Sequence, residues 1–122
     1  SNTSLGINVF RKILKSISAE LSTFDINIVE KHHTKKIDAP SGTAKTLSED
    51  IKNATGREHV EISAIRAGTI PGEHTVIFSG VDEILEIKHT AFSKKIFARG
   101  AINLAMKLSS KSPGYYLMED FF

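Results

Sequence analysis

The sequence predicts an α+β fold with a mixed, largely antiparallel sheet. Three segments repeat apolar residues at helical spacing, two in the first half of the chain and one near its end. Four short segments typical of strands lie between these helices, and a tight turn joins the last two of them. Because the chain has no internal repeat and no low-complexity linker, we expect residues 1–122 to form a single domain.

The first helix is predicted over residues 5–21. Its apolar residues recur at three- and four-residue spacing: Leu5, Val9, Phe10, Ile13, Leu14, Ile17 and Leu21. The possible N-caps before it are Asn2, Thr3 and Ser4. From residue 24 the period changes to two, since Phe24, Ile26 and Ile28 alternate with polar residues. This alternation predicts a strand that leads into residues 30–33.

A loop separates this strand from a second helix. Residues 35–42 break any regular pattern, and Pro40 keeps the residue before it out of the helical region. The helix that follows has its apolar residues at helical spacing, Ala44, Leu47, Ile51 and Ala54, and Gly56 is a plausible stop.

The second half of the chain predicts three strands and a helix. The strands are expected at residues 60–66, 74–79 and 83–89, with the turn at 80–82 joining the last two. Residues 94–109 form a helix that is apolar nearly all round, so we expect it to need cover on more than one side. Residues 115–118 are expected to form a final short strand.

Composition and charge exclude several classes of protein. With 40% hydrophobic and 25% charged residues and no Cys, the chain is neither disordered nor a disulfide scaffold. No apolar run approaches the ~18 residues of a membrane span and no leader opens the chain, so we expect a soluble, cytoplasmic protein without a membrane partner. A formal charge of +2, with two Tyr and no Trp, does not suggest nucleic-acid binding.

One stretch, residues 30–44, combines ionisable groups, a loop and a helix start. The opening of the second helix offers free N–H groups, hydroxyl donors and the positive end of the helix dipole, at Ser41, Gly42 and Thr43. Positive charge gathers just before it, at His32, His33, Lys35 and Lys36. This pattern indicates an anion site, while a solvated turn with ordinary capping residues remains the alternative. The two imidazoles can line one pocket only if the strand ends between them.

Other kinds of site are less well supported. Five His together with Glu30, Asp38 and Glu73 could supply metal ligands, but the chain has no His-Glu-x-x-His motif and no thiolate, so we expect no metal. Ser41 does not lie in a Gly-x-Ser-x-Gly elbow. No Gly-x-Gly-x-x-Gly follows a strand, and no dinucleotide-binding fold is therefore expected in this chain.

Two ordered motifs together resemble one family. The first runs from Glu30-Lys31-His32-His33 through Lys36 to Asp38-Ala39-Pro40-Ser41-Gly42-Thr43-Ala44. The second comprises Arg66-Ala67-Gly68, Gly72-Glu73-His74-Thr75, Glu86-Ile87-Lys88-His89 and Phe97-Ala98-Arg99-Gly100-Ala101. This chain resembles the C-terminal substrate-binding and tetramerisation domain of dihydrodipicolinate reductase, also called 4-hydroxy-tetrahydrodipicolinate reductase. The resemblance implies a sheet of about four strands with helices packed on one face.

The resemblance also implies residue roles. His32 would be the catalytic histidine and Lys36 the general acid, while His33 would help to bind the substrate. A substrate carboxylate would be held at the helix start by Ser41, Gly42 and Thr43. Lys94 stands where the family often has Arg, so it keeps the charge but loses the bidentate fork.

The activity implied is NAD(P)H-dependent reduction of a small dicarboxylate in the diaminopimelate route to lysine. The family holds NADPH or NADH on an N-terminal Rossmann domain, which we expect to be absent here, and in the family residues from about 94 onward normally return toward that domain. We therefore expect no bound cofactor and no turnover by this chain alone. In the family the sheets pack together in a tetramer, so we expect a homo-oligomer. The alternative is a non-catalytic oligomerisation or small-anion-binding module that retains the fold.

Overall fold

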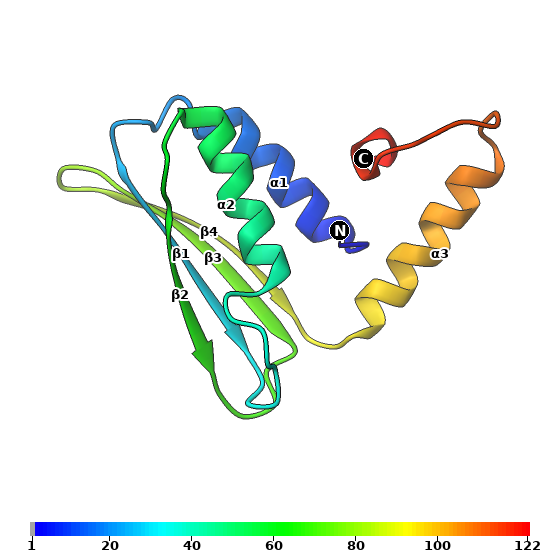
Figure 1. Cartoon of the computed structure of the whole chain (residues 1–122), viewed down its shortest axis with the longest axis horizontal. Helices are drawn as coiled ribbons and strands as arrows, with labels where there is room; N and C mark the ends of the chain where they lie inside the picture. Colours follow the sequence, from blue (N-terminus) through cyan, green and yellow to red (C-terminus); the bar gives the residue numbers. More distant parts are fainter. Residues whose placement is uncertain (1) are drawn as a thin grey trace.

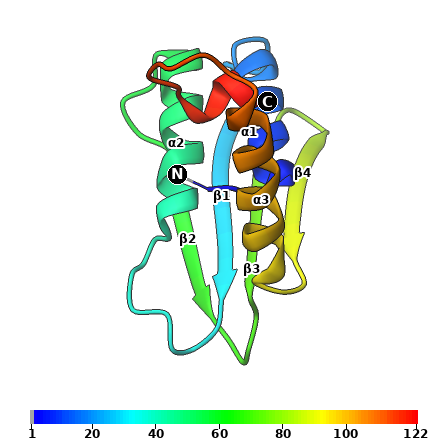
Figure 2. The ribbon, with the colours of Figure 1, turned by 90° about the vertical axis from the view of Figure 1, so that its right-hand side faces the viewer.

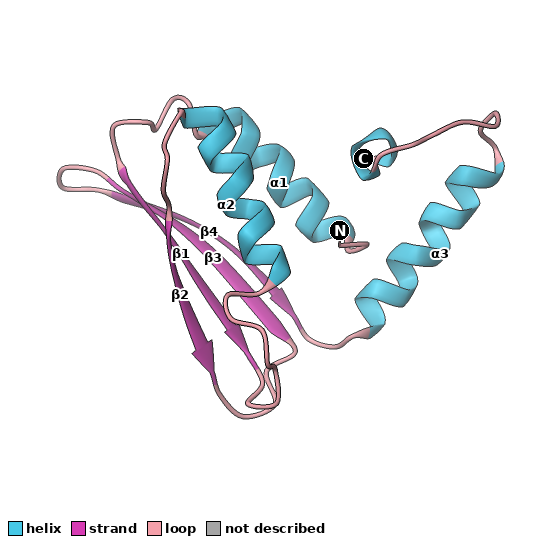
Figure 3. Ribbon diagram, viewed as in Figure 1, coloured by secondary structure: helices cyan, strands magenta, loops and turns pink. Residues whose placement is uncertain are grey.

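The structure is a computed structural model that describes residues 2–122. Figure 1 shows a sheet, two helices packed against one face of it, and a third helix that stands apart. The elements are α1 (Leu5–Ile17), β1 (Asp25–His32), α2 (Gly42–Thr55), β2 (Glu61–Arg66), β3 (Gly72–Ser79), β4 (Ile84–Ala91), α3 (Lys95–Ser109) and the short 3-10 helix η1 (Met118–Phe121). The predicted α+β class is thereby confirmed, as Figure 3 shows by secondary structure.

The four strands form one mixed sheet in the order β2-β1-β3-β4. The β1–β2 pair is parallel and is connected through α2, whereas β1–β3 and β3–β4 are antiparallel. The predicted hairpin turn is present, since the Gly80 amide donates to the Glu83 carbonyl at 2.9 Å. The expected mixed, largely antiparallel sheet of about four strands is confirmed.

The core lies between the sheet and the two helices. Along β1 the even-numbered residues are buried, so this strand turns one face to the helices as its alternating pattern predicts. The helices bury one face each against this side of the sheet, mainly through Ile7, Phe10 and Leu14 of α1 and Ala44, Leu47 and Ile51 of α2. The core thus fixes where the C-terminal end of β1 meets the start of α2.

Capping residues define both of these helices. The Ser4 hydroxyl accepts from the Ile7 amide at the start of α1, and the Ser41 hydroxyl accepts from the Ala44 amide, 3.1 Å away, at the start of α2. Gly56 ends α2 in the left-handed region, with φ 74°, as the sequence predicted for a stop there.

The predicted end of α1 is wrong. The helix ends at Ile17 rather than at residue 21, and residues 18–23 form turns that lead into β1. Leu21 still packs against the core, and its amide donates to the Ile17 carbonyl at 3.1 Å. The helical spacing of Leu21 from the apolar residues before it therefore reflects a turn and not a continued helix.

The strand expected at residues 115–118 is also wrong. This segment is irregular and leads into η1. The Asp120 carboxylate accepts from the Leu117 amide at 2.6 Å, and such a local contact favours a helical turn over an extended strand. Lys15 on α1 pairs with Glu119 of this turn at 2.9 Å, which places the tail beside α1, as Figure 2 shows.

The third helix contacts the rest of the molecule near its start and, near its end, through Lys107, whose ammonium donates to the Phe121 carbonyl at 2.6 Å. Its single buried residue is Gly100, where an added Cβ would come within 1.9 Å of the Thr3 carbonyl oxygen. Ile102 and Met106 are exposed. The cover that we expected for this apolar helix is therefore not supplied by residues 2–122. Among the described helices, none has the length and apolar composition needed to cross a bilayer.

Candidate functional site

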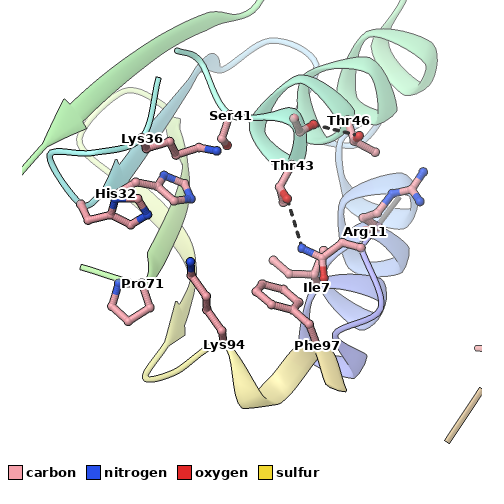
Figure 4. A pocket seen from close by; sticks show the side chains of 13 residues that line it. Ile7, Arg11, His32, Lys36, Ser41, Thr43, Thr46, Pro71, Lys94 and Phe97 are labelled. Atoms are coloured by element: carbon pink, nitrogen blue, oxygen red, sulfur yellow. Dashed lines mark hydrogen bonds between the residues drawn. The ribbon is translucent and has the colours of Figure 1, made fainter. Parts of the chain in front are cut away.

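A cavity of about 370 Å³ lies where the end of β1, the start of α2 and the start of α3 meet (Figure 4). All seven residues predicted for the site line it: His32, His33, Lys36, Ser41, Gly42, Thr43 and Lys94. The structure thus brings together residues that lie up to 62 positions apart in the sequence, from 32 to 94. Ile7 and Phe97 add apolar surface to the side opposite the imidazoles, as Figure 4 shows.

The end of β1 places the two imidazoles. The strand stops at His32, which is 8% exposed on the face that the helices cover. His33 is the first residue of the following loop, so the alternation of the strand no longer directs it to the opposite face. This is the condition under which both side chains can line one pocket, and both do. The pKa of His33 is lowered by desolvation and by the nearby positive charge of Lys94.

The start of α2 presents donors to the cavity. Ser41 is the N-cap, and among residues 2–122 the amides of Gly42 and Thr43 have no acceptor. The Thr43 hydroxyl accepts from the Asn2 side-chain amide at 3.1 Å, so its own proton is available to a ligand. Two amides, a hydroxyl and the helix dipole therefore converge on one place that suits a carboxylate.

The lysines supply the positive charge of the cavity. Lys94 has no acidic partner within residues 2–122, and Figure 4 shows its ammonium directed into the cavity. Lys36 pairs with Asp38 at 2.7 Å, and this contact lowers the pKa of the Asp38 carboxyl. Arg11 is already neutralised by Asp50, with its two contacts at 2.6 and 2.9 Å. Lys94 is thus the least compensated cation at the cavity.

A buried polar network contacts the residues that line the cavity. Glu30 is fully buried and accepts hydrogen bonds from Arg66, from the Ser41 amide and from the His32 ring. Burial alone would raise the pKa of Glu30, but the hydrogen bonds from Arg66, His32 and Ser41 outweigh it and hold the pKa below its ordinary value. His74 lies edge-on to His32 and contacts the Ser41 hydroxyl at 2.9 Å. Burial lowers the pKa of His74 to about 4.

The described residues do not fit a dinucleotide or a metal ion. The strand-helix-strand unit with parallel strands is β1–α2–β2, and its first loop, residues 33–41, contains no glycine where a pyrophosphate-binding turn needs several. Within residues 2–122, no three His, Asp or Glu side chains are placed to hold a metal ion.

Comparison with known proteins decides the family. The family described as "Dihydrodipicolinate reductase, C-terminus" matches residues 6–122 of this chain. The chain belongs to this family. It is 43% identical to the 4-hydroxy-tetrahydrodipicolinate reductase of Brachyspira hyodysenteriae over 98% of its own length and 59% of that protein. It is 46% identical to the enzyme of the same name from Clostridium novyi, with 98% and 54% of the two chains covered.

The dihydrodipicolinate reductase fold is also found by structural comparison. The solved structure "Dipicolinate bound Dihydrodipicolinate reductase from Paenisporosarcina sp. TG-14" matches with a TM-score of 0.83 at 20% identity, over 100% of this chain and 53% of that one. The present chain therefore spans little more than half the length of these dihydrodipicolinate reductases.

Three residues that support the cavity were missed as site residues from the sequence. Glu30 interrupts the buried, otherwise apolar positions 26 and 28 of β1, and a carboxylate in that phase is a signal that could have been used. Arg66 and His74 stand in the second motif, but no local pattern gave them a site role, because their contacts with Glu30 and Ser41 depend on the pairing of strands that are distant in sequence.

Proposed function

We propose that this chain is the substrate-binding and proton-donating part of a 4-hydroxy-tetrahydrodipicolinate reductase, and that its ligand is a small cyclic dicarboxylate. The observation that carries the proposal is the convergence of Lys36, Lys94 and the start of α2 on one cavity. The solved dihydrodipicolinate reductase from Paenisporosarcina sp. TG-14 is dipicolinate-bound, which supports a ligand with two carboxylates here.

The two ends of the cavity suit the two carboxylates. One is held by the Gly42 and Thr43 amides and by the Thr43 hydroxyl, where the helix dipole also favours negative charge. The other is attracted by Lys94, with His33 beside it. Because part of the wall is apolar, at Ile7 and Phe97, a flat ring also finds surface to pack on.

Reduction adds a hydride and a proton to the substrate. Lys36 is the proton donor, since its ammonium lies at the cavity and can leave Asp38 for the ligand. His32 is the second ionisable group at the reacting centre. In the full-length enzyme NADPH or NADH would supply the hydride, and it would be held outside residues 2–122, which do not fit a dinucleotide. The isolated chain is accordingly expected to have no turnover, which an assay with NADPH and substrate checks.

Isothermal titration calorimetry with pyridine-2,6-dicarboxylate tests the binding function. The unmodified chain should bind it, and Thr43→Ala and Lys36→Ala should each weaken binding by about tenfold or more. Lys35→Ala is the matched control, because Lys35 is exposed in the same loop and does not line the cavity. No binding by the unmodified chain, or equal losses in all three variants, would contradict the proposal.

Self-association is the second part of the proposed function. Among residues 2–122, α1 and α2 cover one face of the sheet and leave the other uncovered. Val29 and Ile77 lie on this face half-buried and Ile65 lies on it exposed. A second copy of the chain would cover them in a homo-oligomer, and the proposed state is a tetramer.

A further inference from the structure

Both oxygens of the Glu30 carboxylate are saturated with donors. Oε1 accepts from Arg66 Nη2 at 2.8 Å and from the Ser41 amide at 3.0 Å. Oε2 accepts from Arg66 Nη1 at 2.9 Å and lies 2.5 Å from His32 Nδ1. The Arg66 guanidinium and the Ser41 amide can only donate, so the carboxylate that faces them is ionised.

An ionised Glu30 decides the proton position on His32. A carboxylate is only an acceptor, and Nδ1 must therefore carry the hydrogen. The other ring nitrogen, Nε2, has no hydrogen-bond partner within residues 2–122, and it is not among the buried unpaired atoms, so solvent reaches it. Since His32 lines the cavity, Nε2 is the ring atom left to meet a ligand.

The same carboxylate also fixes the start of α2. The Ser41 amide that donates to Glu30 belongs to the N-cap of this helix, whose next two amides are free for a ligand. One buried side chain on β1 thus touches both the imidazole and the anion-binding end of α2. Arg66 on β2 compensates its charge and also donates to the Asp38 carbonyl at 2.6 Å, which ties the intervening loop to the same group.

We propose that Glu30 is a positioning residue that holds neutral His32 as the Nδ1–H tautomer, with the Nε2 lone pair facing the ligand, and sets its distance from the start of α2. This inference rests on the proposed function of the cavity. In this tautomer, neutral His32 can only accept a proton or a hydrogen bond at Nε2. Nε2 can donate to a ligand carboxylate only when the ring is protonated.

The tautomer can be measured without a ligand, with one variant, His32→Gln, used only to assign the ring signals. In the full 122-residue chain labelled with ¹⁵N at histidine, a ¹H–¹⁵N correlation at about pH 9, above the ordinary histidine pKa of ~6.5, distinguishes a protonated ring nitrogen from a bare one. The His32 signals are those that are missing from the spectrum of His32→Gln. In the unmodified chain they should show a protonated Nδ1 and a bare Nε2. A protonated Nε2 with a bare Nδ1 would overturn the proposal.

Glu30→Gln then tests the consequence for binding. The side-chain amide of the new Gln directs at least one N–H at neighbours that are themselves donors. The His32 signals should therefore move toward the other tautomer. Pyridine-2,6-dicarboxylate should bind at least about tenfold more weakly. Glu61→Gln, with a 64% exposed side chain on β2, is the matched control and should change neither readout. If Glu30→Gln does not fold, the tautomer of the unmodified chain still decides the proposal.

The two proposals fail in different ways. If the unmodified chain shows the Nδ1–H tautomer but binds no dicarboxylate, the proposed function is wrong and the arrangement of His32 by Glu30 stands. If the unmodified chain binds the dicarboxylate, and Glu30→Gln binds it equally well with an unchanged tautomer, the positioning role is wrong and the proposed function stands.

Discussion

His74 lies beneath the loop that carries Ser41, and its side chain is 4% exposed. Its pKa of about 4 results mainly from burial, with His32 and His89 in their protonated forms and Lys36 acting in the same direction and Glu30 acting against it. His74 is therefore neutral at neutral pH. Its contact with Ser41 is one between neutral groups, and the Ser41 hydroxyl is held in the geometry that caps α2.

This lowered pKa makes stability depend on pH. His74 has a pKa of ~6.5 in the unfolded chain and of about 4 in the folded chain, so between these pH values the unfolded chain binds a proton more readily. The contribution of neutral His74 to the free energy of unfolding is therefore complete above this pH range and is lost as the pH falls through it. The loss should be about 2 kcal/mol between pH 7 and pH 5. Urea unfolding at the two pH values should show it, and His74→Gln should remove most of this difference. His59→Gln, whose side chain is 78% exposed, is the control that should keep it.

Lys94 gives a second prediction at the scale of one side chain. Because it has no acidic partner within residues 2–122, its full charge is available to a dianion. Lys94→Ala should weaken binding of pyridine-2,6-dicarboxylate by about tenfold, while Lys94→Arg should strengthen it about threefold by restoring a bidentate fork. Calorimetry measures both. Equal affinity of Lys94→Ala and of the neighbouring exposed control Lys95→Ala would contradict this role.

The sequence allowed the loop residues of the site to be predicted but not the group behind them. Six of the seven predicted residues share local signals, namely a charge cluster, a break before Pro40 and a helix start, whereas Lys94 was implied only by the family resemblance, and all seven line the cavity. The partnership of Glu30 with Arg66, and the place of His74 beside it, depend on strand register. A one-residue slip would send Glu30 to the opposite face, so no local pattern could establish these contacts.

At the scale of the element, the two ends of α2 use glycine differently. Gly56 has φ 74° and nothing within 4 Å of an added Cβ, so substitution there costs only backbone strain. Gly42 also has nothing within 4 Å of an added Cβ, but its φ is not in the left-handed region. Gly56→Ala should therefore lower the free energy of unfolding by about 1 kcal/mol, while Gly42→Ala should leave it equal or raise it. Urea unfolding of both variants compares them, and an equal loss in both would refute this explanation.

The helices and strands were predictable to the extent that their contacts are local. β2, β3 and β4 were predicted as short strand-type segments bounded by turns, and β2 shows no alternation of burial. Periodicity located α1, α2 and β1, because each of them repeats or alternates against one common core. It failed at residues 18–21 and 115–118. In both places a turn with its own hydrogen bonds replaced the element that apolar spacing suggested. The order β2-β1-β3-β4 follows from pairing across the sheet and had no signal in the spacing.

At the scale of the whole molecule, two surfaces remain open within residues 2–122. One is the sheet face away from α1 and α2, and the other is the surface of α3, where Ile102 and Met106 are exposed. The sheet face has a polar cluster as well, because Glu73 pairs with Lys31 at 2.8 Å and with Lys88 at 2.9 Å. Because these charges pair with one another, a second copy could cover the neighbouring apolar residues without burying an unpaired charge.

Self-association should therefore use the sheet face. Light scattering should give a mass that is a multiple of the 13.4 kDa of one chain, with four copies expected. Ile65→Lys places a charge on this face, where it would be buried by a second copy, and should shift the mass toward one chain. Ile102→Lys makes the same change on α3, and should leave the assembly intact because α3 lies away from the sheet face (Figure 1). Dissociation by Ile102→Lys but not by Ile65→Lys would assign the interface to α3, and a monomeric unmodified chain would refute self-association itself.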